Sequence, residues 1–132
     1  MREAVEGTTE APRRRKAAVD GSVLAHQIVD VLVDRQAVDV VMLDLTMLSA
    51  FTDYFVVATV DNQRQMQALI ESVNEMIDGM SGVRFRQEGA PESGWVLLDV
   101  GPVVVHLFGL EERARYNLEG LWSRATEVVR VQ

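Results

Sequence analysis

The segment GWVLLDVGPVVVHLFG, residues 94–109, constrains the fold of this chain more than any other. It is typical of two β-strands joined by the dipeptide Gly101-Pro102, because glycine accepts the positive φ at the first central position of a type II′ turn and proline fits the second. Successive side chains of a strand point to opposite faces, so this pairing sorts them into two sets. We therefore predict a β-hairpin with two chemically different faces.

One face of the predicted hairpin is aliphatic and suits a protein core. It carries Val96, Leu98, Val100, Val103, Val105 and Leu107. The other, which we call the mixed face, carries Trp95, Leu97, Asp99, Val104, His106 and Phe108. Two interpretations of the mixed face stay open. Either it meets a partner, or a helix of the same chain covers it and leaves Asp99 near the open end.

The composition is that of one ordinary globular domain. The chain has 132 residues, of which 48% are hydrophobic and 25% charged, enough for a single core. No apolar run approaches the roughly 18 residues that a membrane span needs, and the N-terminus lacks a signal-peptide pattern. We expect a cytoplasmic protein with no membrane segment. The lack of cysteine excludes disulfides, thiolate metal ligands and cysteine nucleophiles.

Charge is distributed unevenly along the chain. The formal net charge is −7, but residues 1–20 hold five basic and four acidic groups, which leaves residues 21–132 at −8. Nucleic acids are bound mainly through Lys and Arg, so the acidic body disfavours direct, sequence-specific nucleic-acid binding and favours a basic protein partner. Residues 1–20 show no apolar period and are predicted to be a disordered tail, with the domain over residues 21–132.

Apolar periodicity predicts the remaining elements. We expect a first helix capped by Ser22 and ending near Arg35, and a last helix that begins near Glu111 with Tyr116 opposite its apolar stripe. That stripe is expected to bury Ala114, Leu118, Leu121, Trp122 and Ala125. Between these helices we expect strands at residues 40–45, 54–60 and 83–87, a helix over about 62–80, and the hairpin. The order predicts an α/β fold with a mixed five-stranded sheet flanked by helices.

The motifs of common enzymes are missing. There is no GxGxxG, GxxxxGK[ST], HExxH or GxSxG, and the two histidines, His26 and His106, lie on different predicted elements. Carboxylates are scattered rather than clustered. We therefore predict no cofactor, no metal site and no catalytic residues. For His106 we favour packing and hydrogen bonding at a protein interface. The alternative is that His106 and the nearby Asp99 carry out acid–base chemistry.

Taken together, the remaining motifs resemble the ribosomal silencing factor family, also called Iojap-like. The resemblance covers about residues 22–122 and depends on the order and spacing of the whole series. Its pieces are Asp44-Leu45-Thr46, Ser49, Phe51 through Thr59 (FTDYFVVAT), Arg64-Gln65, Glu88-Gly89, Trp95, Leu98-Asp99, Val104-Val105-His106, Arg113, Tyr116, Leu118-Glu119 and Leu121-Trp122.

This resemblance implies a factor that binds a ribosomal protein on the intersubunit face of the large ribosomal subunit. It would thereby block joining of the small subunit and repress translation. It also implies a scaffold similar to the nucleotidyltransferase fold without its catalytic residues. The family's partner contact maps onto Trp95, Asp99 and His106. Glu88 with Asp99 would meet basic side chains, and Tyr116 would serve the same contact or a homodimer.

Two other functions remain open from the sequence. One is a nucleotide-binding or nucleotidyl-transferring enzyme that uses Asp44, Asp53, Asp99 and His106. The other is a structural homodimer whose self-interface is the mixed face.

Overall fold

The centre of the fold is a parallel pair of strands buried on both faces of the sheet. In the computed structural model, which describes residues 20–48 and 51–132, β3 (Tyr54–Val60) pairs with β6 (Val103–Gly109) from Tyr54↔Val103 to Val60↔Gly109. Strands covered on both sides are typically continuous apolar runs, as YFVVATV and VVVHLFG are.

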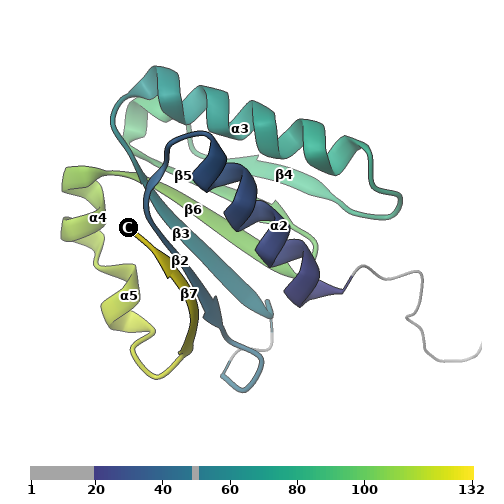
Figure 1. Cartoon of the computed structure of the whole chain (residues 1–132). Helices are drawn as coiled ribbons and strands as arrows, with labels where there is room; N and C mark the ends of the chain where they lie inside the picture. Colours follow the sequence, from purple (N-terminus) through teal and green to yellow (C-terminus); the bar gives the residue numbers. More distant parts are fainter. Residues whose placement is uncertain (1–19, 49–50) are drawn as a thin grey trace, which may run out of the picture.

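The sheet has six strands in the order β4-β5-β6-β3-β2-β7, with β3 and β6 parallel and the other pairs antiparallel (Figure 1). The fold is therefore α/β with a mixed sheet, as predicted. The further elements are α2 (Gly21–Asp34), β2 (Val38–Asp44), α3 (Gln63–Asp78), β4 (Phe85–Glu88), the 3-10 turn η1 (Pro91–Ser93), β5 (Trp95–Val100), α4 (Leu110–Tyr116), α5 (Leu118–Leu121) and β7 (Thr126–Val131).

Helices α2 and α3 lie side by side across one face of the sheet (Figure 1). Their apolar stripes bury Leu24, Ile28 and Leu32 from α2 and Leu69 and Val73 from α3 against this face. The first helix begins where predicted, but its cap is Asp20 rather than Ser22. The Asp20 carboxylate accepts hydrogen bonds from the next turn, and Ser22 supplies one of those backbone donors.

The hairpin forms with the predicted register. β5 and β6 pair from Trp95↔Phe108 through Leu97↔His106 to Val100↔Val103. Gly101 has a φ of 56°, the positive value that a type II′ turn requires at its first central position. The aliphatic face of the hairpin joins the core under α2 and α3, which confirms that part of the prediction.

The prediction of five strands is wrong, because β7 adds a sixth at the edge beside β2. The sequence TEVVRV is rich in β-branched residues, which favour a strand. The pairing is irregular: Met42 lies opposite Val129 and Leu43 opposite Glu127, so the register shifts between them.

The single last helix that we expected is instead two short helices. Asn117 adopts a left-handed backbone (φ 46°, ψ 52°), which ends α4 and lets its side chain cap α5 at Gly120. Leu118 is buried as predicted, whereas Leu121 is 77% exposed. Ala114 is also exposed, and Trp122 and Ala125 are half-buried. Asn117 is the residue that made the predicted stripe wrong.

A buried arginine ties α4 and α5 to the sheet. Arg113 is 8% exposed, and its guanidinium donates to both carboxylate oxygens of Glu119 at 2.9 and 3.0 Å. It also donates to the Thr59 hydroxyl in β3 and to the Asp39 carbonyl at the start of β2. The hydrogen bond from Arg113 holds the pKa of Glu119 below its usual range. Arg130 in β7 completes the network through Asp39 and Glu119.

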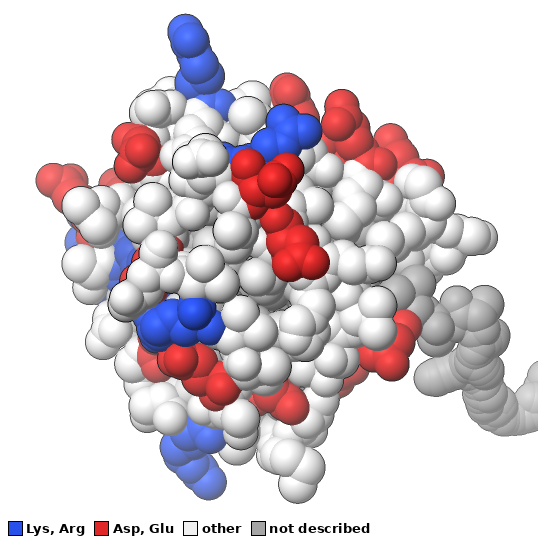
Figure 2. Space-filling model, viewed as in Figure 1, with Lys and Arg blue, Asp and Glu red and all other residues white. Residues whose placement is uncertain are grey.

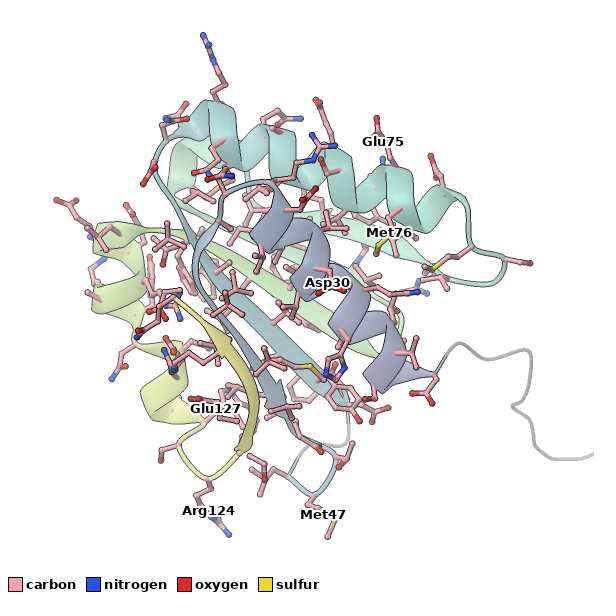
Figure 3. All side chains as sticks on the ribbon, in the orientation of Figure 1. Asp30, Met47, Glu75, Met76, Arg124 and Glu127 are labelled. Carbon is pink, nitrogen blue, oxygen red and sulfur yellow. The ribbon has the colours of Figure 1, made fainter. Side chains whose placement is uncertain are left out.

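The outer surface of the described body is acidic and shows no membrane-spanning element. Figure 2 shows carboxylates scattered over the α2 and α3 side, and in Figure 3 Asp30 on α2 and Glu75 on α3 project away from the core. Arg124 and the 91% exposed Met47 extend from the same end of the molecule (Figure 3). None of the helices in residues 20–48 and 51–132 is both long and apolar enough to cross a bilayer.

Replacing Arg113 by alanine is expected to lower the free energy of unfolding by about 3 kcal/mol, because the Thr59 hydroxyl and the Asp39 carbonyl lose the Arg113 donor and Glu119 keeps only Arg130 as its cation. Thermal or denaturant unfolding measures this change. The matched control is Arg115→Ala on the same helix, where the side chain is 62% exposed and 3.9 Å from Glu112; its expected cost is below about 1 kcal/mol. Equal losses in the two variants would contradict the structural role of Arg113.

Candidate functional site

The face of the sheet opposite α2 and α3 holds a groove that contains most of the mixed face. Its volume is about 380 Å³. We call it the aromatic groove, and it is lined by Phe51, Phe55, Arg86, Glu88, Trp95, Leu97, Asp99, Val104, His106, Leu118 and Trp122. Of the five residues that we predicted for a partner contact, four line it: Glu88, Trp95, Asp99 and His106.

The loop before β5 fixes the position of Trp95. Gly89 has a φ of 84°, and a Cβ there would lie 2.6 Å from the Trp95 carbonyl oxygen, so this approach of two backbone segments requires glycine. The backbone N–H of Trp95 donates to the Ser93 hydroxyl. The indole then stacks on Phe108 with ring centroids 5.1 Å apart. Trp95 is half-buried, so one part of its ring system is fixed and another is available.

His106 supports the indole from beneath. It is 3% exposed, and its Nδ1 accepts a hydrogen bond from Trp95 Nε1 at 3.2 Å. This bond places the proton of the neutral imidazole on Nε2, which is buried and has no partner within the described residues. The Phe55 ring meets the imidazole edge to face, with centroids 4.6 Å apart. Burial lowers the pKa of His106 from 6.5 to about 4, so the ring is neutral at neutral pH.

Helices α4 and α5 cover one part of the mixed face and leave the rest open. Tyr116, at the end of α4, is 44% exposed and lies over Trp95 with centroids 4.6 Å apart. Leu118 and Trp122 close the groove from the α5 side, where Trp122 meets Phe55 at 5.5 Å. The interpretation that a helix of the same chain covers the mixed face is thus confirmed in part, and the interpretation that the face meets a partner stays a prediction. The chain covers Phe108 and His106, whereas Trp95, Leu97 and Asp99 stay accessible.

The carboxylates of the groove already have a cation in this chain. Arg86 lies opposite Asp99 in the β4–β5 ladder, and its Nη2 is 2.7 Å from Glu88 Oε2 and 3.7 Å from Asp99 Oδ2. From the sequence we predicted that Glu88 and Asp99 meet basic side chains of a partner, but not that Arg86 of the same chain pairs with both. Alternation along β4 was the available signal, because Arg86 and Glu88 are two positions apart and so share a face.

The four residues proposed for an enzyme do not share one site, because Asp99 and His106 line the aromatic groove whereas Asp44 and Asp53 do not. The Asp44 carboxylate is used locally, since it accepts hydrogen bonds from the backbone N–H and hydroxyl of Thr46. Asp99 pairs with Arg86, and His106 with Trp95. Within the described ranges, no three or more histidine or carboxylate side chains gather as metal ligands. Thr52 acts structurally, as its hydroxyl reaches the Pro102 carbonyl at 3.0 Å, and Ser49 lies outside the described residues.

A second hollow of about 360 Å³ lies where the parallel strands β3 and β6 end. Carboxylates at its wall come from Asp61, Glu92, Glu111 and Glu112. The chain continues from these strand ends into α3, which packs on one face of the sheet, and α4, whose Tyr116 lies over Trp95 on the other face. In α/β enzymes such a place often holds a ligand. An acidic wall disfavours nucleotide phosphates, and this hollow contains none of the residues predicted for a site.

A family model and the named relatives give one family. The model of the family described as "Ribosomal silencing factor during starvation" matches residues 18–132. A ribosomal silencing factor from Zymomonas mobilis is 34% identical over 89% of this chain and 88% of its own length. The one from Bacillus subtilis is 39% identical over 70% of this chain and 78% of its own.

Solved structures and plant relatives agree with this result. A crystal structure of a protein from Chromobacterium violaceum matches with a TM-score of 0.74 at 31% identity, covering 84% of this chain and 94% of that one. One from Bacillus halodurans matches with a TM-score of 0.63 at 35% identity, over 84% and 95%. The chloroplastic Iojap protein of Arabidopsis thaliana is 31% identical over 79% of this chain and 43% of its own length.

The buried imidazole makes stability depend on pH. As the pH falls below 6.5, His106 becomes protonated in the unfolded chain, whereas in the folded chain it stays neutral until about pH 4. The free energy of unfolding therefore falls as the pH falls from 6.5 to about 4. The expected contribution is about 3 kcal/mol. Urea unfolding at a series of pH values, for wild type and His106→Phe, measures it. The variant is expected to lose stability less steeply across the window, and parallel curves would contradict the assignment.

Proposed function

Because the chain belongs to the ribosomal silencing factor family, we propose that its aromatic groove binds a ribosomal protein on the intersubunit face of the large ribosomal subunit. When this chain is bound there, it blocks joining of the small subunit and so represses translation. The observation that carries this proposal is a tryptophan held rigidly at an open groove.

The environment of Trp95 suits a binding hot spot. Its indole is fixed by His106, Phe108 and Tyr116, so little side-chain entropy is lost when a partner packs against it. Tryptophan and tyrosine at the centre of a contact commonly dominate its energy, and truncation costs on the order of 2 kcal/mol. A rigid aromatic pair beside an open apolar groove therefore supports an interface with another protein.

Electrostatics support a basic partner. Residues 21–132 carry a formal charge of −8, and such a field speeds association with a positively charged surface. The same charge repels the phosphates of ribosomal RNA. A ribosomal protein that exposes basic side chains fits both conditions.

Steric occlusion needs nothing beyond binding in the right place. A folded body of about this length has a radius of gyration near 14 Å, so it projects well above the surface that it covers. Overlap with the docked position of the small subunit is then sufficient to prevent joining. No chemical step enters this mechanism.

The test is co-sedimentation with separated large and small ribosomal subunits, with subunit joining read from the same gradients. Wild type is expected to sediment with the large subunit and to suppress joining. Tyr116→Ala and Trp95→Ala are expected to lose at least about tenfold in affinity, because each removes one ring of the aromatic pair. Trp95→Ala also loses internal packing, so its unfolding temperature is measured first.

Val23→Ala is the control for this experiment, since Val23 is exposed on α2, on the other side of the sheet. It is expected to bind like wild type. Normal binding by folded Tyr116 and Trp95 variants would remove the groove from the interface. A second copy of the chain is the competing occupant. Sedimentation velocity decides this, because a dimer through this face would become monomeric in both variants.

A further inference from the structure

The cation within the groove, Arg86, pairs weakly with the two carboxylates that we predicted would meet a basic partner. Arg86 and Glu88 are 60% and 56% exposed as side chains, and Asp99 is 30% exposed. Ion pairs with such exposure contribute little to stability and exchange readily. Arg86 lies on β4, the edge strand of the sheet, in which only Phe85 is half-buried.

We propose that Arg86 is a specificity-determining residue, an internal competitor that occupies the place of a basic side chain of the partner until the partner displaces it. This inference depends on the proposed function of the groove. With Arg86 paired, the three groups have a net charge of −1. Once Arg86 turns away, Glu88 and Asp99 present a charge of −2 beside Trp95.

The pairing separates partners by their chemistry. A single loosely placed cation gains little from exchanging with Arg86, because one ion pair replaces another. A partner that also buries an apolar side chain against Trp95 and Leu97 gains free energy from that packing. The same contact holds the partner's cation close to the carboxylates of Glu88 and Asp99. Arg86 therefore lowers affinity for basic surfaces in general and leaves discrimination to the aromatic groove.

The test compares Arg86→Gln with wild type in equilibrium binding and association kinetics with purified large ribosomal subunits. At low ionic strength the variant is expected to bind about fivefold more tightly and to associate faster, because the competing cation is gone. The gain is expected to shrink at high salt. Binding of polylysine, used as a nonspecific cation, is expected to rise by a larger factor than binding of the subunits.

Arg84→Gln is the matched control. It removes the same charge two residues earlier, where the exposed side chain has no ion pair within the described part of the chain. Its effect on affinity is expected to be clearly smaller. In a chain that already carries Glu88→Gln and Asp99→Asn, Arg86→Gln is expected to add nothing, because its two partners are gone.

The outcomes separate this inference from the proposed function. If wild type binds the subunits, Tyr116→Ala does not, and Arg86→Gln binds no better than Arg84→Gln, the groove stands and the role of Arg86 is wrong. Weaker binding by Arg86→Gln would show that Arg86 itself contacts the partner, which also overturns the inference. If wild type binds neither subunit, the proposed function fails and the inference fails with it.

Discussion

The buried guanidinium of Arg113 is the interaction on which the second face of the sheet depends. It binds Glu119 in α5, Thr59 in β3 and the backbone at Asp39 in β2, so one side chain fixes two short helices against two strands. Helices of seven and four residues have little stability alone. Their position on the sheet therefore depends on tertiary contacts, and those of Arg113 are polar, specific and at least partly buried.

That position creates the groove. The left-handed Asn117 turns the chain between α4 and α5, so that Tyr116 lies on Trp95 while Leu118 and Trp122 reach Phe55 and the far wall. The two short helices take the place of the single last helix that the apolar period predicted. Clamped by Arg113, they leave part of the mixed face open. The groove is therefore a consequence of how this helical segment is broken.

Sequence reasoning succeeded where structure is determined locally. The β5–β6 register followed from alternation and from Gly101-Pro102, and α2 and α3 from their apolar period, because each pattern lies within one element. Prediction from the sequence failed where contacts between residues distant in sequence determine the structure. Nothing near Arg113 indicates burial, since its partners Thr59 and Asp39 are more than fifty residues away in sequence. β7 was missed because the helix was continued past Asn117 toward the β-branched residues that follow.

The aromatic groove likewise has features that local sequence patterns predict and features that depend on long-range contacts. The mixed face and its residues were predictable from the hairpin, and the exposure of Tyr116 from its position opposite the apolar stripe of the last helix. Alternation along β4 places Arg86 beside Glu88, but the pairing of Arg86 with Asp99 was not predictable, because the two residues meet only through the pairing of β4 with β5. Long-range attraction depends on the net charge of the body, whereas short-range recognition depends on which charges are already paired. An acidic chain attracts many basic surfaces, so selectivity requires a short-range contact, and we propose that the fixed indole and the displaceable Arg86 of the groove provide it.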